Sequence, residues 1–196
     1  LLANHSSTPG DDYCTAVGNH ANSGLPTSAH VDDLNPLLSR YEMTGGDVIY
    51  IDTGIYRGVD PWRIRQANSA GTLGTTPVIF QGSTNSFPSR TVLDRQFSFD
   101  GILVDYAIGV RLRNLTVSNT LGMAVALRNS YAIAAENISV VSGNIAFYLS
   151  AGDGLRIAHS AVNDSNKGVQ IDSSTSGRTN YPVIENNVFW GMNGTG

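Results

Sequence analysis

Residues 112–117 read LRNLTV, and the same pattern returns as AENISV at residues 135–140, IAHSAV at residues 157–162 and IENNVF at residues 184–189. The third position of each copy is Asn or His, and these positions lie 23, 22 and 27 residues apart by subtraction. The last interval is longer because it contains a polar stretch, residues 173–180. A nearly constant period of this length is typical of a repeat protein in which each repeat forms one turn of a solenoid.

A second series of apolar segments keeps the same phase. It consists of residues 102–104 (ILV), 125–127 (VAL), 147–149 (FYL) and 169–171 (VQI), with spacings of 23, 22 and 22 residues by subtraction. Two series with one period indicate that the repeat is a structural unit and not a chance similarity.

Each repeat contains several short strands with an apolar residue at every second position, separated by Gly, Asn, Ser or Asp. A unit this short can coil so that each strand pairs in parallel with its equivalent one turn later, about 4.8 Å away. We therefore expect inward columns of stacked side chains, with Phe147 between Val125 and Val169, and Leu149 between Leu127 and Ile171. The Asn after the first strand suits a sharp bend because Asn tolerates the left-handed backbone conformation. His159 occupies the same position, so we interpret it as a turn residue and not as a general base.

The composition narrows the classes of function. The chain has 196 residues, of which 14% are charged, and its net charge is −4; an average soluble domain has about 25% charged residues. An electrostatic nucleic-acid binder is therefore not expected. No apolar run is long enough to span a membrane. Cys14 is the single cysteine, which excludes an internal disulfide and a zinc site built on several thiolates.

These repeats resemble the right-handed parallel β-helix, or pectin-lyase-like, superfamily, of the type found as modules in large bacterial secreted and surface proteins. The resemblance implies an all-β solenoid, for which we count about six coils, with an N-terminal capping helix. The cap is expected in residues 31–46, where Leu34, Leu37, Leu38 and Tyr41 follow the spacing of an amphipathic helix.

The resemblance also implies a domain organisation. Residues 47–196 are expected to form the parallel β-helix, and residues 1–30 a polar lead-in packed on it. The carboxylates and amides of the lead-in are of the type that binds calcium, but they lack the spacing of an EF-hand loop. We favour a structural loop without a metal site or cofactor, and keep calcium as the alternative. We expect further coils or domains of the same polypeptide to follow Gly196, because an uncapped β-helix leaves strand edges open.

The outward side of the second series is the expected binding surface. Strand alternation places Leu103, Ala126, Tyr148 and Gln170 in one outward column, and Asp105, Arg128, Ser150 and Asp172 in the column just beyond it. Guanidinium, carboxylate, amide and aromatic groups together are suited to a sugar polymer. The candidate substrate-binding residues are Asp105, Arg128, Tyr148, Gln170 and Asp172. The alternative is that Asp105 and Arg128 form an ordinary exposed ion pair.

Two classes of function remain open. We expect a noncatalytic module of a large exported bacterial protein, located outside the cell or on its surface, with polysaccharide as its ligand. The alternative is a carbohydrate-active enzyme, either a polysaccharide lyase or a uronate epimerase. Asp105 and Asp172 would lie three coils apart, about 14 Å at the strand spacing, whereas a glycoside hydrolase needs carboxylates about 5–9.5 Å apart. The sequence identifies no catalytic residues.

Overall fold

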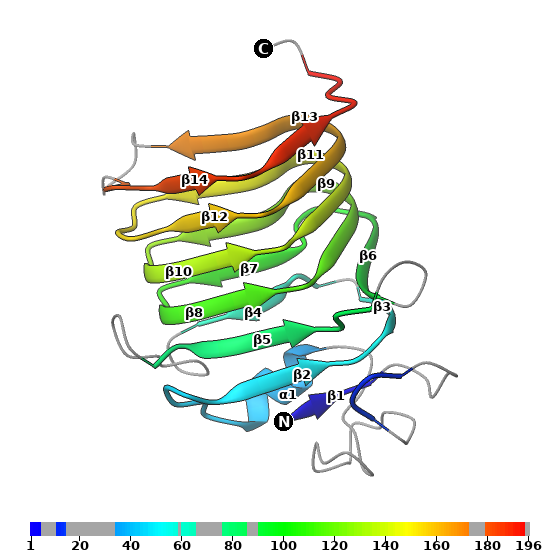
Figure 1. Ribbon diagram of the computed structural model, residues 1–196, viewed down its shortest axis with the longest axis vertical. Helices are drawn as coiled ribbons and strands as arrows, with labels where there is room; N and C mark the ends of the chain where they lie inside the picture. The colour runs from blue at the N-terminus through cyan, green and yellow to red at the C-terminus, as the bar shows by residue number, and fades with distance from the viewer. Residues whose placement is uncertain are drawn as a thin grey trace.

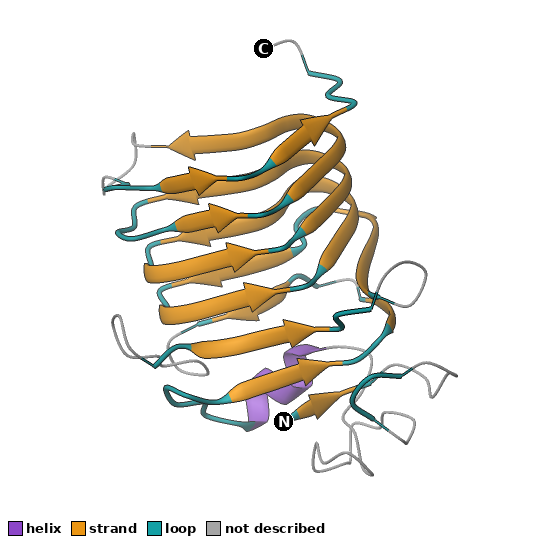
Figure 2. Cartoon of the chain, viewed as in Figure 1, coloured by secondary structure: helices purple, strands orange, loops and turns teal. Residues whose placement is uncertain are grey.

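The protein is a right-handed parallel β-helix, as the repeats predicted. The computed structural model describes residues 1–4, 11–14, 34–58, 60–65, 76–85, 90–172 and 179–194. Parallel strands stack along the long axis of the molecule, with the N-terminus near one end and the C-terminus at the other (Figure 1). Strands dominate the described residues, and the single helix lies beside the first turn (Figure 2).

One sheet of seven strands forms the first face of the solenoid. Its strands, in spatial order, are β1 (Leu2–Ala3), β2 (Val48–Ile51), β5 (Val78–Gly82), β8 (Ile108–Arg113), β10 (Tyr131–Glu136), β12 (Arg156–Ala158) and β14 (Val183–Glu185). All of its pairings are parallel. Neighbouring strands of this sheet therefore belong to successive turns of the solenoid, as expected for a chain that coils in one direction.

The other sheet bends and forms two further faces. Its strands are β3 (Gly54–Arg57), β4 (Trp62–Ile64), β6 (Thr91–Ser98), β7 (Ile102–Asp105), β9 (Thr116–Arg128), β11 (Ser139–Ser150), β13 (Ala161–Asp172) and β15 (Val188–Trp190). The long strands turn at Asn119, Ser142 and Asp164, whose φ angles are 56°, 57° and 54°. We call the part before this bend the second face. The third face consists of β4, β7 and the ends of β9, β11 and β13.

The register of the third face agrees with the predicted columns. Phe147 pairs with Val125 and Val169, and Leu149 pairs with Leu127 and Ile171. Phe147 and Leu149 are fully buried. The interior of the coil is one continuous apolar core from the capping helix to Val162, so the turns are held together by side-chain stacking as well as by strand pairing.

The number of turns is about four, slightly fewer than the six expected. Counting the strands of the first face overestimates the number because it includes incomplete turns at the ends. Among the described residues up to 194, no third-face strand follows β15.

The helix α1 (Leu34–Arg40) closes the end of the core near β2. Leu34, Leu37 and Leu38 are buried, as the amphipathic spacing predicted. The side chain of Asn35 fixes the helix to the first turn, because its Nδ2 donates to the carbonyl oxygen of Pro61 and its Oδ1 accepts from the backbone N–H of Arg63, both at 3.0 Å. Residues 31–33 of the expected cap lie outside the described residues.

The first residues of the chain pack against the same end. Leu2 and Ala3 add strand β1 to the first face beside β2. The carboxylate of Asp52 accepts hydrogen bonds from the backbone N–H groups of Asp12, Tyr13 and Cys14 at 2.6, 2.9 and 2.6 Å. The described part of the lead-in is therefore anchored to the first turn.

The opposite end of the solenoid exposes apolar side chains. On β14 and β15, Val183, Val188 and Phe189 are 43%, 60% and 40% exposed. Ile171, an inward position by register, is 47% exposed. The columns of the core thus continue to the last turn, where no neighbouring turn covers them among the described residues.

Candidate functional site

The third face places the predicted side chains on adjacent strands. Asp105, Arg128, Ser150 and Asp172 occupy one row across β7, β9, β11 and β13. Tyr148 and Gln170 are neighbours in the adjacent row. The outward series therefore has the register that the repeat predicted, and these side chains share one surface.

One expectation about this surface was wrong. Leu103 and Ala126, which were placed on the outside, are only 3% and 0% exposed. Strand alternation determines which way a side chain points, but not whether another segment packs over it. The accessible part of this row is consequently limited to Tyr148 and Gln170, which are half-buried.

Asp105 and Arg128 form a loose ion pair at the end of strands β7 and β9. Asp105 is buried, and its Oδ1 accepts a hydrogen bond of 2.9 Å from Nδ2 of Asn129. The distance from Asp105 Oδ2 to the nearer guanidinium nitrogen of Arg128 is 3.8 Å. Arg128 Nε is buried and has no hydrogen-bond partner among the described residues. Asp105 therefore does not hold the guanidinium in a bidentate pair, and a ligand carboxylate can compete for it.

Tyr148 and Asp172 form the second polar contact of the face. The hydroxyl of Tyr148 donates to Oδ2 of Asp172 at 3.0 Å. Burial, together with this hydrogen bond, raises the pKa of Tyr148 above its ordinary value, so the phenol stays protonated at neutral pH. Gln170 accepts a hydrogen bond of 3.0 Å from the Nζ of Lys167, which brings a second cation to this face.

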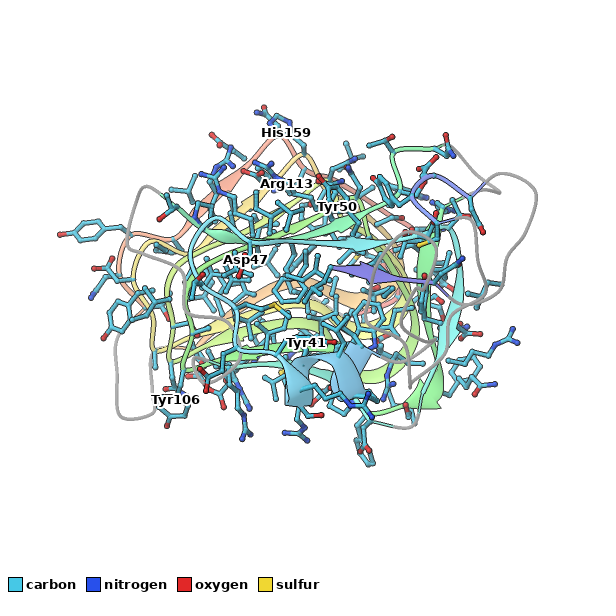
Figure 3. The ribbon with its side chains drawn as sticks, turned by 90° about the horizontal axis from the view of Figure 1, so that it is seen from below. Tyr41, Asp47, Tyr50, Tyr106, Arg113 and His159 are labelled. Carbon is cyan, nitrogen blue, oxygen red and sulfur yellow. The ribbon has the colours of Figure 1, made fainter. Side chains whose placement is uncertain are left out.

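Sequence reasoning missed two tyrosines at the corner beside these residues. Tyr106 and Tyr131 are 63% and 50% exposed, and with Asn129 they line a small pocket of about 110 Å³. Tyr106 lies at the edge of the molecule, where its φ of 54° turns the chain (Figure 3). The sequence held one indication of this pocket, since Tyr106 directly follows Asp105 and Asn129 directly follows Arg128.

The arrangement does not provide a pair of catalytic carboxylates. Asp105 and Asp172 lie three strand spacings apart, about 14 Å. Each already accepts a hydrogen bond, from Asn129 or from Tyr148. A tyrosine acting as a base would need a lowered pKa, whereas that of Tyr148 is raised. Asp105, Asp172 and Tyr148 therefore provide neither a close pair of carboxylates nor a tyrosine with a lowered pKa.

A charged row on the first face is structural. Arg113 Nε donates to Glu136 at 2.9 Å, and Arg156 pairs with both Glu136 and Glu185. Partial burial alone would raise the pKa of Glu136, but the hydrogen bond from Arg113 and the nearby guanidinium charges lower it below the ordinary value. The ion pair of Arg113 with Glu136 thus belongs to a longer ladder.

The Asn column forms the corner between the first and second faces. Asn114, Asn137 and Asn186 have φ angles of 55°, 55° and 54°, and His159 has 52°. The side chain of Asn137 donates to that of Asn114. His159 is thus a turn residue as predicted, although it is exposed and not packed, and it projects at the rim of the molecule (Figure 3).

No group of three or more His, Cys, Asp or Glu side chains among the described residues is placed to hold a metal ion. The carboxylate of Asp12 instead bonds Ser83 and Asn85, and that of Asp11 accepts from Thr53 and Asn4. The remaining residues of the lead-in, 5–10 and 15–30, lie outside the described residues, so the calcium alternative for these stretches stays a prediction.

Comparison with known proteins supports the fold. The sequence matches no model of a known protein family and no curated protein. Among solved structures, a rhamnogalacturonan lyase is similar with a TM-score of 0.59 and 16% identity, over 88% of this chain and 49% of the lyase. A protein of Parabacteroides merdae, provisionally assigned as a glycosyl hydrolase, gives a TM-score of 0.47 and 9% identity, over 74% of this chain and 83% of its own. The chain thus spans about half the length of the lyase.

These observations define the class of protein. The chain has a parallel β-helix fold, similar to that of the rhamnogalacturonan lyase, with a polar and aromatic surface on its third face. In the parts of the chain that the structure covers, no helix is long and apolar enough to cross a membrane.

Proposed function

We propose that this chain is a polysaccharide-binding β-helix module of an exported bacterial protein, and that its third face holds a uronate-containing polymer without cleaving it. The observation that carries the proposal is the loosely held Arg128 guanidinium beside Tyr148 and the corner tyrosines. One structural neighbour is named as a lyase of rhamnogalacturonan, and the shared fold supports carbohydrate as the class of ligand.

Arg128 supplies the charge recognition. Its side chain is 32% exposed, and its contact with Asp105 is long, at 3.8 Å. A guanidinium presents paired N–H donors that match the two oxygens of a carboxylate. A uronate carboxylate can therefore accept hydrogen bonds from Arg128 while Asn129 continues to hold Asp105. Lys167, exposed on the same strand as Asp172, adds a second positive charge.

The aromatic side chains supply the apolar contacts. Sugar rings have apolar faces that pack against aromatic rings, while their hydroxyls bond amides and carboxylates. Tyr148 lies next to Arg128, and Tyr106 and Tyr131 border the same corner. Arg128, Tyr148 and Asp172 are half-buried and lie on the successive strands β9, β11 and β13. The accessible groups are therefore spread along the solenoid and match an extended ligand better than a single sugar.

Affinity electrophoresis in gels containing polygalacturonate or alginate tests the proposal. We expect the wild-type protein to be retarded, and Arg128→Ala and Tyr148→Ala each to weaken the affinity about tenfold, equivalent to about 1.4 kcal/mol. Arg111→Ala is the matched control, since Arg111 lies on β8 of the first face. Loss of retardation in Arg111→Ala alone, or unchanged retardation in both face variants, would contradict the assignment of the face.

An assay for cleavage separates binding from catalysis. The proteins are incubated with polygalacturonate and alginate, with and without calcium, and new unsaturated chain ends are followed by ultraviolet absorbance. We expect no increase. An increase that Arg128→Ala abolishes would show that the face is the active site of a lyase, which is the competing class.

A further inference from the structure

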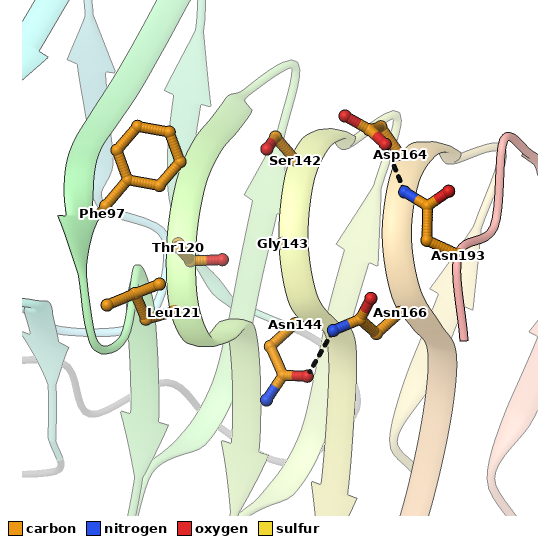
Figure 4. Close-up of a pocket in the computed structure, with 9 residues that line it drawn as sticks. All are labelled: Phe97, Thr120, Leu121, Ser142, Gly143, Asn144, Asp164, Asn166 and Asn193. Carbon is orange, nitrogen blue, oxygen red and sulfur yellow. Dashed lines mark hydrogen bonds between the residues drawn. The ribbon is translucent and has the colours of Figure 1, made fainter. Parts of the chain in front are cut away.

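A second hollow of the surface lies at the bend between the second and third faces, away from the residues of the proposed uronate site. This groove, of about 340 Å³, crosses β9, β11 and β13. Phe97 and Leu121 stand on one side, and polar side chains of the later turns stand on the other (Figure 4). The groove therefore combines an apolar wall with hydrogen-bonding groups.

A buried arginine fixes the loop that supplies the apolar wall. Arg95 is 1% exposed, and its Nε donates to the carbonyl oxygen of Asp100 at 2.7 Å. Its NH1 donates to the carbonyl oxygens of Gly58 and Asp60 at 2.5 and 2.8 Å. The loop thereby presents Phe97 and Phe99, which are 59% and 78% exposed. Phe97 lines the groove, whereas Phe99 is not among the residues that line it.

Amide side chains form the polar wall. Nδ2 of Asn166 donates to Oδ1 of Asn144 at 3.1 Å, and the side chain of Asn193 donates to Asp164. These contacts leave further amide N–H and C=O groups directed outward, because each amide has two donor hydrogens and an acceptor oxygen. The described residues that line the groove include no Lys, Arg or His, and Asp164 is their one charged residue.

The floor holds an unsatisfied hydroxyl. Thr120 is 4% exposed, and its Oγ1 has no hydrogen-bond partner among the described residues. The hydroxyl points along the groove toward Gly143 (Figure 4). A Cβ at Gly143 would lie 2.9 Å from Thr120 Oγ1, closer than packed atoms come, so the hydroxyl fills the space that a side chain at position 143 would need. Thr120 and Gly143 therefore form the closed floor of the groove, and a ligand contacts its walls.

We propose that this groove is a second binding site, for neutral sugar units. The apolar wall at Phe97 packs against the face of a sugar ring, and the Asn side chains exchange hydrogen bonds with its hydroxyls. A uronate is disfavoured, because the single charge of the groove, on Asp164, would repel it. The site differs from the proposed uronate face both in its residues and in the charge that it selects.

Affinity electrophoresis with the neutral polymers xylan, galactan and glucomannan, each in a separate gel, tests the inference on the full chain. We expect retardation in at least one gel, and a loss of affinity of about tenfold in Phe97→Ala. Phe99→Ala is the matched control, because it removes an exposed ring from the same loop without changing the groove, and we expect it to bind as the wild type does.

Thr120→Val is a second control, for the floor of the groove. The substitution keeps the β-branched shape and removes a buried hydroxyl that has no partner among the described residues, so the melting temperature should stay the same or rise. Affinity for the neutral polymer should stay that of the wild type, because the hydroxyl is not accessible to a ligand. A loss of affinity in Thr120→Val as large as that in Phe97→Ala would contradict binding by the walls of the groove.

The test also separates this site from the uronate face. We expect Phe97→Ala to bind polygalacturonate normally and Arg128→Ala to bind the neutral polymer normally. The inference is overturned if no neutral polymer retards the protein, if Phe97→Ala and Phe99→Ala behave alike, or if the neutral polymer depends on Arg128 instead. The last result would overturn the groove alone and leave the uronate face in place.

Discussion

Single side chains determine where the chain of this solenoid turns and how its first segment is attached. Asn114, Asn137 and His159 take the left-handed conformation at one corner, and Asn119 does so at another. The carboxylate of Asp52 accepts hydrogen bonds from three backbone N–H groups of the lead-in. These contacts involve few atoms, yet they decide whether a turn closes or a segment stays attached, and they give two predictions at the residue scale.

The first prediction concerns Cys14. Burial, followed by the charge of Asp52 and a hydrogen bond to it, raises the pKa of the Cys14 thiol to about 12. Because the thiolate is the reactive form, a disulfide reagent at about pH 8 should modify the folded protein on the order of a thousandfold more slowly than the unfolded protein.

Asp52→Asn should remove this protection. The variant loses the anionic acceptor that holds residues 12–14, so Cys14 should react much faster while circular dichroism still shows the folded solenoid. Equal reaction rates for the wild-type and Asp52→Asn proteins would show that Asp52 does not anchor the segment.

The second prediction concerns Glu136, whose lowered pKa gives a defined dependence on pH. A carboxyl group with a lowered pKa in the folded state stabilises the fold above its ordinary pKa, which is 4.5 for Glu, and loses that contribution as the pH falls through the folded-state value. Glu136→Gln should therefore lower the free energy of unfolding at neutral pH, by on the order of 1 kcal/mol.

The difference between the wild-type and Glu136→Gln proteins should shrink as the pH falls below 4.5. Urea unfolding at a series of pH values measures it. A difference that is constant over the whole range would mean that the ion-pair ladder with Arg113 and Arg156 contributes nothing.

At the scale of the strands, stability comes from columns of side chains at equivalent positions in successive turns. Phe147 lies between Val125 and Val169 and is fully buried. Each inward side chain thus packs against the equivalent side chains of the turns above and below it. A cavity in one turn therefore weakens the packing of both neighbouring turns.

Phe147→Ala should lower the free energy of unfolding by about 3–5 kcal/mol, the usual cost of removing a buried aromatic side chain. Tyr148→Ala, at the next position of the same strand but on the outward side, should cost much less. Chemical unfolding followed by circular dichroism compares them, and equal losses would contradict the inward and outward assignment of β11.

The strands and their register were predictable from the sequence because both follow from local rules. Alternation fixes the direction of each side chain, and the 22- to 23-residue spacing fixes which residues of successive turns pair. The burial of Leu103 and Ala126 was not predictable, since it depends on packing from outside the strands. Neither was the groove at Phe97, because it depends on Arg95 reaching carbonyl groups about 35 residues earlier in the chain.

The candidate site was predictable in part for the same reason. Asp105, Arg128 and Asp172 share a row because their spacing matches the period, and the repeat alone placed them together. The loose contact between Asp105 and Arg128, and the corner pocket of Tyr106 and Tyr131, required coordinates, since both depend on side-chain conformation and on the turn between strands.

At the scale of the whole molecule, the two ends of the solenoid differ. α1 and β1 lie at one end, where the core is buried. At the other end, the side chains of β14 and β15 are exposed. In a solenoid each turn contacts only its neighbours, so local stability should vary along the axis.

Amide hydrogen exchange should show this gradient. We expect the slowest exchange in β8, β10 and the middle of β11, which are paired on both sides, and the fastest exchange of the strands in β15, which has one neighbour. Uniform protection from β8 to β15 would indicate that the solenoid unfolds as one unit, and would contradict nearest-neighbour stabilisation.

The low proportion of charged residues follows from the architecture of the whole solenoid. Inward columns and corner turns occupy most positions of a turn of about 22 residues, and like charges repeated at the strand spacing would repel. Some of the charges that remain form the ladder of the first face, and others form the row of Asp105, Arg128 and Asp172 on the third face. The guanidinium groups of the ladder are held by short ion pairs, whereas Arg128 has one long contact of 3.8 Å with Asp105.

Size-exclusion chromatography of the protein mixed with polygalacturonate, with light scattering to follow polymer size, tests whether the third face binds the polymer without cleaving it. We predict that the wild-type protein elutes with polymer of unchanged length, and that Arg128→Ala elutes alone. Elution of the wild-type protein apart from the polymer, or a polymer shortened by the protein, would contradict a binding face that does not cleave its ligand.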